Sequence, residues 1–112
     1  MSTVSTHVLD AATGRPAAGV SVRLERAPSA GEPGDTVVEA NTDIDGRLRL
    51  DRANLTAGVY RLVFDTGTYF SATGREAFYP EVSVTFWVRE SGQHYHVPLL
   101  LSPFAYSTYR GS

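Results

Sequence analysis

Apolar and polar residues alternate along most of this chain, and this period of two constrains its fold more than any other feature. The alternation runs through residues 20–25, 47–50, 82–89 and 94–101. Successive side chains of a β-strand point to opposite faces, so each of these stretches predicts a half-buried strand. Residues 59–64 carry apolar side chains on both faces, which predicts a central strand covered on both sides.

Turn signals separate the predicted strands. Asp45-Gly46 lies between residues 37–42 and 47–50 and predicts a β-hairpin, because glycine accepts a positive φ. Ser91-Gly92 separates two of the longer strands, and the polar residues 28–35 predict a surface loop.

Residues 66–77 are the one stretch that breaks the strand rhythm. We expect a short helix over residues 68–73, ended by Gly74, because a glycine commonly follows the last helical turn. The aromatic side chains of this stretch are also compatible with a packed loop.

The ends of the chain follow the strand pattern as well. Residues 1–10 alternate and lack the basic and apolar regions of a signal peptide, so we expect a first strand here. Residues 106–109 predict the last one. About eight short strands with regular turn signals predict an all-β fold, a two-sheet antiparallel β-sandwich with one short helix. A chain of 112 residues has the length of one domain, so we expect a single domain over residues 1–112.

Pro98 conflicts with its place in the strand predicted over residues 94–101. Proline has no N–H to donate to a sheet ladder. We therefore expect a bulge or an unpaired position at Pro98.

The composition excludes several classes of function. Cysteine is absent and all ten cationic residues are arginines, which excludes a disulfide framework, a thiolate nucleophile and Schiff-base chemistry. With a net charge of −2 and scattered arginines, we expect none of the basic surface with which proteins bind nucleic acid. No run of about 18 apolar residues occurs, so we expect no membrane span. We expect a cytoplasmic protein.

Three histidines are the first candidates for chemistry, because histidine titrates near neutral pH and both takes and gives a proton. Alternation places His7 and His96 opposite apolar neighbours, so both imidazoles should point away from the core. A lone histidine on a strand is more often an ordinary surface or hydrogen-bonded residue. His94 shares the face of His96; the pair has the spacing of a chelate, but two histidines without a third ligand are a weak metal signal.

Arg47 and the end of the chain add further candidates. Arg47 follows the Asp45-Gly46 turn on the same strand face as Arg49. A strand arginine often does no more than keep the strand soluble, whereas a guanidinium beside two imidazoles suits a planar, oxygen-rich substrate. The last four residues follow a predicted strand closely, so we expect them to be held in place rather than frayed.

Five segments together resemble the transthyretin-related family, whose enzymes are 5-hydroxyisourate hydrolases. They are residues 5–10, 13–16, 42–47, 94–103 and the closing Tyr-Arg-Gly-Ser of residues 109–112. The resemblance covers nearly the whole chain. The closing tetrapeptide is its specific part, because it distinguishes the hydrolases from the hormone-carrying transthyretins.

The resemblance implies a fold, an assembly and a set of site residues. The fold is a prealbumin-type sandwich that assembles into a homotetramer, a dimer of dimers with active sites where the dimers meet. The implied catalytic residues are His7, Arg47, His96 and Ser112. The residues implied to complete the substrate pocket are Tyr109, Arg110 and Gly111.

The implied reaction belongs to urate degradation. Water opens the six-membered ring of 5-hydroxyisourate at an acyl carbon–nitrogen bond and gives 2-oxo-4-hydroxy-4-carboxy-5-ureidoimidazoline. We assign His7 as the base, Arg47 as the group that polarises substrate oxygens, and His96 as the group that orients water and shares in proton transfer. The division of labour between the two histidines stays open. Ser112 would add its hydroxyl or its terminal carboxylate, and no metal or cofactor is expected.

Two noncatalytic alternatives remain at this point. Residues 14–20, 42–47 and 57–62 also resemble the carboxypeptidase-regulatory-like sandwich that serves as a spacer. A transthyretin-type small-ligand carrier is the other alternative. A spacer would not need both histidines and an ordered tetrapeptide, and the tetrapeptide also disfavours the carrier.

Overall fold

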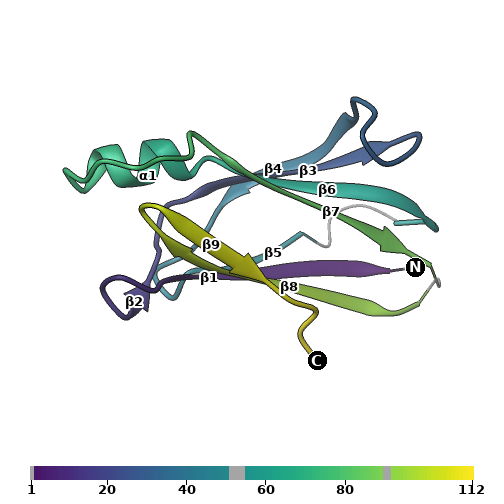
Figure 1. Cartoon of the computed structure of the whole chain (residues 1–112). Coiled ribbons are helices and arrows are strands. Elements are labelled where there is room, and N and C mark those ends of the chain that lie inside the picture. Colours follow the sequence, from purple (N-terminus) through teal and green to yellow (C-terminus); the bar gives the residue numbers. More distant parts are fainter. Residues whose placement is uncertain (1, 51–54, 90–91) are drawn as a thin grey trace.

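The chain forms two β-sheets packed face to face, with one short helix at one end (Figure 1), in a computed structural model that describes residues 2–50, 55–89 and 92–112. The first sheet has the order β2-β1-β8-β9, with β5 also paired to β1; its strands are β1 (Thr3–Asp10), β2 (Arg15–Pro16), β5 (Arg47–Arg49), β8 (His94–Ser102) and β9 (Ala105–Thr108). The second has the order β4-β3-β6-β7; its strands are β3 (Ser21–Ala27), β4 (Asp35–Asn41), β6 (Gly58–Phe64) and β7 (Val82–Val88). The predicted all-β sandwich is confirmed.

The core lies between the two sheets and consists of the inward-facing residues that alternation predicted. Val4 and Val8 of β1 and Leu62 and Phe64 of β6 have no exposed surface. β6 is an interior strand of its sheet, and its outward-facing Val63 is also only 4% exposed. The prediction that this strand is central in its sheet is therefore confirmed, whereas its outward face is only partly covered, since Val59 and Arg61 are half-buried.

The pairing of β1 with β8 departs from the antiparallel pattern. These two strands run parallel, whereas the other strand pairs of the described residues are antiparallel. Most of the chain lies between β1 and β8, so no hairpin forces them into opposite directions. The parallel register sets Thr3 opposite His94, Ser5 opposite His96 and His7 opposite Pro98.

The Asp45-Gly46 turn forms, but the hairpin predicted around it is wrong. β4 belongs to the second sheet and β5 to the first, so this turn passes the chain from one sheet to the other. Gly46 has a φ of 75° and accepts a hydrogen bond at its carbonyl oxygen from the backbone N–H of Val8, at 2.8 Å. A Cβ at Gly46 would lie 2.4 Å from the Val8 carbonyl oxygen. The turn therefore packs directly against β1 and places β5 alongside that strand, with which it pairs.

The helix predicted before Gly74 is present as α1 (Thr66–Ala72). Gly74 has a φ of 72°, and the backbone N–H of Arg75 donates to the Phe70 carbonyl oxygen at 2.9 Å. This is the hydrogen bond with which a left-handed glycine closes a helix. No helix of the described residues is long and apolar enough to cross a membrane. Of the predicted Ser91-Gly92 turn, Ser91 lies outside the described residues, and Gly92 has a φ of 87°.

Pro98 lies opposite His7 of β1, but on the side of β9 it occupies an unpaired position, as predicted. The β8–β9 ladder ends at the pair of Leu99 and Thr108, and pairing resumes at a single bridge between His96 and Gly111. Pro98 lies between these two points, where its missing N–H breaks no ladder bond. Its carbonyl oxygen accepts a hydrogen bond from the Thr108 hydroxyl at 2.7 Å.

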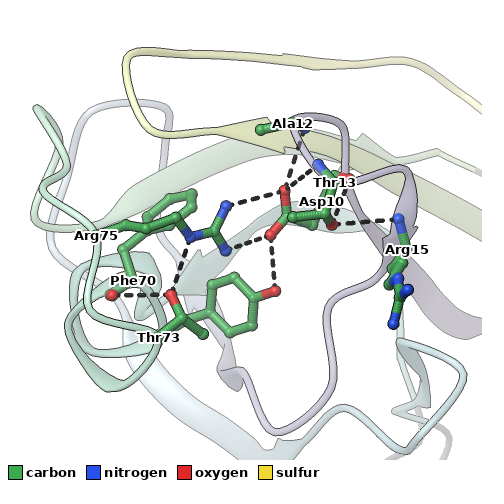
Figure 2. Close-up of polar contacts among 8 residues, drawn as sticks. Asp10, Ala12, Thr13, Arg15, Phe70, Thr73 and Arg75 are labelled. Carbon is green, nitrogen blue, oxygen red and sulfur yellow. Dashed lines mark hydrogen bonds and ion pairs between the residues drawn. The ribbon is translucent and has the colours of Figure 1, made fainter.

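Asp10 ties the end of β1 to the segment that follows α1 (Figure 2). Its buried carboxylate pairs with the Arg75 guanidinium and accepts hydrogen bonds from the Tyr69 hydroxyl at 2.9 Å and from the backbone N–H groups of Ala12 and Thr13 at 3.1 and 3.2 Å. Burial alone would raise the pKa of Asp10, but the hydrogen bonds from Arg75, Tyr69 and Thr13 outweigh it and lower that pKa below its ordinary value.

Replacing Asp10 with asparagine should destabilise the fold near neutral pH. The change leaves Arg75 without its anion, and because Arg75 keeps 27% of its side chain exposed, we expect a loss of about 2–3 kcal/mol, below the full cost of breaking a buried pair. A carboxylate with a lowered pKa stabilises the fold above its unfolded-state pKa and loses this effect as pH falls through the folded-state value. The difference between wild type and Asp10→Asn in urea unfolding should therefore shrink as the pH falls below the ordinary aspartate pKa of 3.8. Asp35→Asn, at the exposed start of β4, is the matched control and should cost little; an equal loss in both variants would contradict this prediction.

Candidate active site

The outer face of the first sheet gathers the predicted catalytic side chains of three strands. β1 lies between β5 and β8, with His7 directly opposite Arg47. Ser5, two residues earlier on the same face, lies opposite both Arg49 and His96. Directly opposite residues have Cβ atoms about 4.5–5.5 Å apart. The register therefore makes His7, Arg47 and His96 neighbours on one face.

The imidazoles point away from the core, as predicted. Val4, Thr6 and Val8 are at most 1% exposed, whereas His7, between Thr6 and Val8, is half-buried. A hollow of about 170 Å³ lies on this face, lined by Ser5, Thr6, Arg47, Leu48, Arg49 and His96. Within the described ranges, the side chains of His7 and Arg47 make no hydrogen bond to the protein. Both are therefore available to a bound molecule.

His96 lies in the most strongly perturbed environment of this face. Partial burial lowers the pKa of His96, and repulsion between its protonated form and any positive charge on His94, His7 or Arg47 lowers it further. The imidazole consequently stays neutral at neutral pH, with a lone pair that can accept a proton.

Asp43 holds the backbone of Arg47 in place, a role that was not predicted from the sequence. The Asp43 carboxylate accepts a hydrogen bond from the Arg47 N–H at 2.9 Å, and the Asp43 N–H donates to the Arg47 carbonyl oxygen, also at 2.9 Å. The same carboxylate accepts from the Asp45 N–H, as an aspartate does in an Asx turn. An aspartate two residues before Asp-Gly was the available signal.

The end of the chain approaches the same face through Gly111. The Gly111 N–H donates to the His96 carbonyl oxygen at 2.8 Å, and a Cβ added at Gly111 would lie only 2.5 Å from Cδ2 of the His96 imidazole. Glycine is therefore the residue that fits against this ring. Ser112 follows it and is exposed. Figure 1 shows the C-terminus on the side of the first sheet that faces away from the second sheet.

Arg110 lies elsewhere in the structure. Its guanidinium carbon is 4.9 Å from the centre of the Tyr95 ring, and its Nη2 donates to the Gln93 side chain at 3.1 Å. Tyr95 faces the core and is 5% exposed, so Arg110 is not brought to His7 and Arg47. Tyr109 is 58% exposed and lines a second hollow of about 260 Å³ together with Tyr95 and Arg110; His96 lines both this hollow and the one on the outer face. The substrate-binding roles of Tyr109 and Arg110 stay predictions.

Replacing Gly111 with alanine should impair the site without unfolding the protein. The new methyl group would displace the His96 ring, and a misplacement of about 1 Å lowers catalytic rates by up to about 100-fold. We expect kcat/KM to fall about 10- to 100-fold, with little change in thermal stability, because Gly111 lies outside the core cluster. Unchanged kcat/KM in a folded Gly111→Ala protein would contradict the placement of this residue against His96.

The described residues contain no group of three or more histidine, aspartate or glutamate side chains arranged to hold a metal ion. The His94 and His96 pair, whose spacing is that of a chelate, is instead engaged with hydroxyl groups. The two ring nitrogens of His94 contact the hydroxyls of Thr3 and Ser5 at 2.6 and 2.8 Å. Among the described residues, no third side chain joins His94 and His96 to form a metal site.

Two sheets in these strand orders, a short helix between β6 and β7, and polar residues grouped on the outer face of one sheet define a transthyretin-type β-sandwich. The chain belongs to the HIUase/Transthyretin family, whose profile matches residues 4–111. The predicted family and fold type are confirmed.

Relatives within this family include both enzymes and transthyretins. The chain is 48% identical to the 5-hydroxyisourate hydrolase of Caulobacter vibrioides, with 100% of both chains covered. The structure of Klebsiella pneumoniae 5-hydroxyisourate hydrolase is 41% identical, with a TM-score of 0.86, and the match covers 100% of this chain and 94% of that one. Transthyretin from Sparus aurata is 32% identical, with a TM-score of 0.87 and coverage of 96% and 95%. Because the two solved structures are equally close in shape, the backbone alone does not separate an enzyme from a transthyretin.

Proposed function

We propose that this protein is a hydrolase that opens the ring of 5-hydroxyisourate to give 2-oxo-4-hydroxy-4-carboxy-5-ureidoimidazoline. The observation that carries the proposal is the grouping of His7, Arg47 and His96 on one outer face. It occurs in a chain that matches curated 5-hydroxyisourate hydrolases over its full length. This activity places the protein in urate degradation.

His7 serves as the general base in the proposed reaction. A neutral imidazole accepts a proton from water as the water oxygen attacks the acyl carbon, and the carbonyl oxygen becomes an oxyanion. The carbon–nitrogen bond then breaks, and the departing ring nitrogen takes a proton from the imidazolium. The protein finishes in its starting protonation state, so the step needs no metal or cofactor.

Arg47 binds the planar substrate and stabilises the oxyanion. Its guanidinium offers forked donors that match two oxygens at once. Arg47 lies directly opposite His7, so the oxyanion and the attacking water would be held by neighbouring side chains. Donors fixed in place before the reaction stabilise developing charge most effectively.

His96 and the closing tetrapeptide complete the proposed site. The lowered pKa of His96, caused by partial burial and the neighbouring positive charges, keeps it neutral to orient the water or the substrate. Ser112 supplies its hydroxyl or its terminal carboxylate next to Gly111, which packs against His96. Tyr109 and Arg110 line the edge of the substrate pocket. For Arg110 this requires its guanidinium to move away from the Tyr95 ring.

We further propose that the single domain of residues 1–112 acts in the cytoplasm as a homotetramer, a dimer of dimers with the sites where the dimers meet. Large apolar side chains on the surface support an assembly, since Trp87 is 59% and Phe104 63% exposed. Activity per chain should fall when the protein is diluted until the tetramer dissociates, measured with light scattering in parallel. A fully active monomer would overturn the shared site.

The activity is tested directly by adding the purified protein to freshly generated 5-hydroxyisourate and following its absorbance. Accelerated decay above the spontaneous rate, unaffected by a chelator, is the expected result. A transthyretin-type carrier, which the structural similarity to Sparus aurata transthyretin favours as the second candidate, would bind a ligand without accelerating the decay. A spacer module would do neither.

A further inference from the structure

Four side chains on the outer face of the first sheet form one continuous hydrogen-bonded chain. The Thr3 hydroxyl contacts Nδ1 of His94 at 2.6 Å, and Nε2 of His94 contacts the Ser5 hydroxyl at 2.8 Å. The same Ser5 hydroxyl contacts Nδ1 of His96 at 2.8 Å. Hydroxyl and imidazole groups alternate because the parallel register sets Thr3 opposite His94 and Ser5 opposite His96.

With the Ser5 hydroxyl donating to one imidazole and accepting from the other, the chain has two arrangements of its protons while both rings are neutral. A neutral imidazole has one N–H and one acceptor nitrogen, and a hydroxyl has one donor hydrogen. In the first arrangement Nδ1–H of His96 donates to Ser5, Ser5 donates to His94, and His94 donates to Thr3. In the second arrangement every hydrogen bond is reversed. Nε2 of His96 has a free lone pair in the first arrangement and carries a proton in the second.

We propose that Ser5 and His94 are positioning residues that set which ring nitrogen of His96 carries the proton and that pass a proton between His96 and the solvent-facing end of the chain. The inference deepens the proposed hydrolase function and rests on it. It assigns a role to His94, for which the spacing had suggested only metal binding. Ser5 is the central link because its hydroxyl contacts both imidazoles, and the residue as a whole is only 8% exposed.

Protons balance in the proposed transfer. When Nε2 of His96 takes the proton released by the carboxyl group that hydrolysis forms, Nδ1–H of His96 passes its proton to the Ser5 oxygen, and Ser5 passes its own proton to Nε2 of His94. His96 and Ser5 end neutral, and His94 becomes an imidazolium whose Nδ1–H donates to Thr3. His94 is exposed and releases the extra proton to solvent.

The charges around His96 favour this direction of transfer. His7 on β1 and Arg47 and Arg49 on β5 share the outer face with His96. The two guanidinium charges, of Arg47 and Arg49, lie on β5, whereas His94 lies opposite Thr3, beyond the residues of β1 that pair with β5. Moving the positive charge from His96 to His94 therefore takes it away from Arg47. Burial and the charges on His94, His7 and Arg47 lower the pKa of His96, which opposes a lasting charge on that ring.

The test combines ¹⁵N NMR of the histidine rings with kinetics in Ser5→Ala. In the wild type we expect one predominant His96 tautomer above its titration, with the proton on Nδ1. In Ser5→Ala the two tautomers should mix, and kcat should fall about tenfold at nearly unchanged KM, the order expected for the loss of one hydrogen bond to a group that becomes charged. Ser5→Thr keeps the hydroxyl and should retain both the tautomer and kcat. Ser83→Ala, an exposed position on β7 of the other sheet, is the matched control.

A double variant shows whether Ser5 and His94 act as one unit. If both belong to one relay, Ser5→Ala combined with His94→Gln should be no slower than the slower single variant. Multiplied losses in the double variant would overturn the relay, as would an unchanged His96 tautomer or an unchanged kcat in folded Ser5→Ala. A wild-type protein that lacks hydrolase activity but shows the Ser5-dependent tautomer would refute the proposed function and leave the hydrogen-bonded chain standing.

Discussion

Replacing His7 with asparagine should lower kcat/KM for 5-hydroxyisourate by about 10²- to 10⁴-fold, the range that a positioned general base contributes. Asparagine has a similar shape and still forms hydrogen bonds, but it takes no proton from water. The loss should appear mainly in kcat, because the base acts in the transition state rather than in substrate binding. Steady-state kinetics on freshly generated substrate measure it.

His94→Asn is the matched control for His7→Asn. It makes the same chemical change on the same face, but His94 acts only through Ser5 and His96 in the proposed scheme. We expect a loss of about tenfold or less in His94→Asn. Near-normal turnover in a folded His7→Asn protein would show that the base assignment is wrong and would move that role to His96.

Replacing Arg47 with lysine should cost about 10²- to 10³-fold in kcat/KM, comparable to the removal of one oxyanion donor. Lysine keeps the positive charge but lacks the forked donors of a guanidinium. Arg23→Lys on β3 is the matched control, because Arg23 pairs with Glu25 on the second sheet and should tolerate the change. Equal kinetics for Arg47→Lys and wild type would contradict a role for the guanidinium geometry.

Arg47 also influences the pKa of His96. After burial and the charge on His94 and His7, the Arg47 charge is a further cause of the lowered pKa of His96. Arg47→Met removes that charge, so the His96 pKa should rise toward its ordinary value. NMR titration of the His96 ring tests the direction, and a pKa that stays or falls would contradict it.

Strand positions followed from the sequence, whereas strand partners did not. Alternation predicted β1, β3, β6, β7 and β8 because facing the core or the solvent is a local property of each residue. It carries no information on strand direction, which is why the parallel pairing of β1 and β8 was not foreseen. The Asp45-Gly46 hairpin failed for a related reason: the turn is local, but β5 joins the sheet in which Gly46 seats against Val8.

The candidate site was likewise only partly predictable from the sequence. Alternation predicted that His7 and His96 point away from the core, and the family resemblance selected Arg47. The supporting contacts of Ser5 and Asp43 required the register and the turn geometry, because each depends on which residue lies opposite. Arg110 lies over Tyr95, and no pattern in the sequence distinguishes that position from one facing His7.

The central claim is that the outer face of the first sheet, and not the hollow beside Trp87 and Tyr95, binds the substrate. Urate is a stable ring analogue, and the chain has three histidines and one tryptophan, so ¹³C and ¹⁵N NMR of these side chains during a urate titration reports on both places at once. His96 lines both hollows, so the discriminating signals are those of His7 and Trp87. We predict a saturable shift of the His7 ring signals with a nearly constant Trp87 indole signal. A shift of the Trp87 indole with unchanged His7 signals would place the ligand in the other hollow and contradict the account.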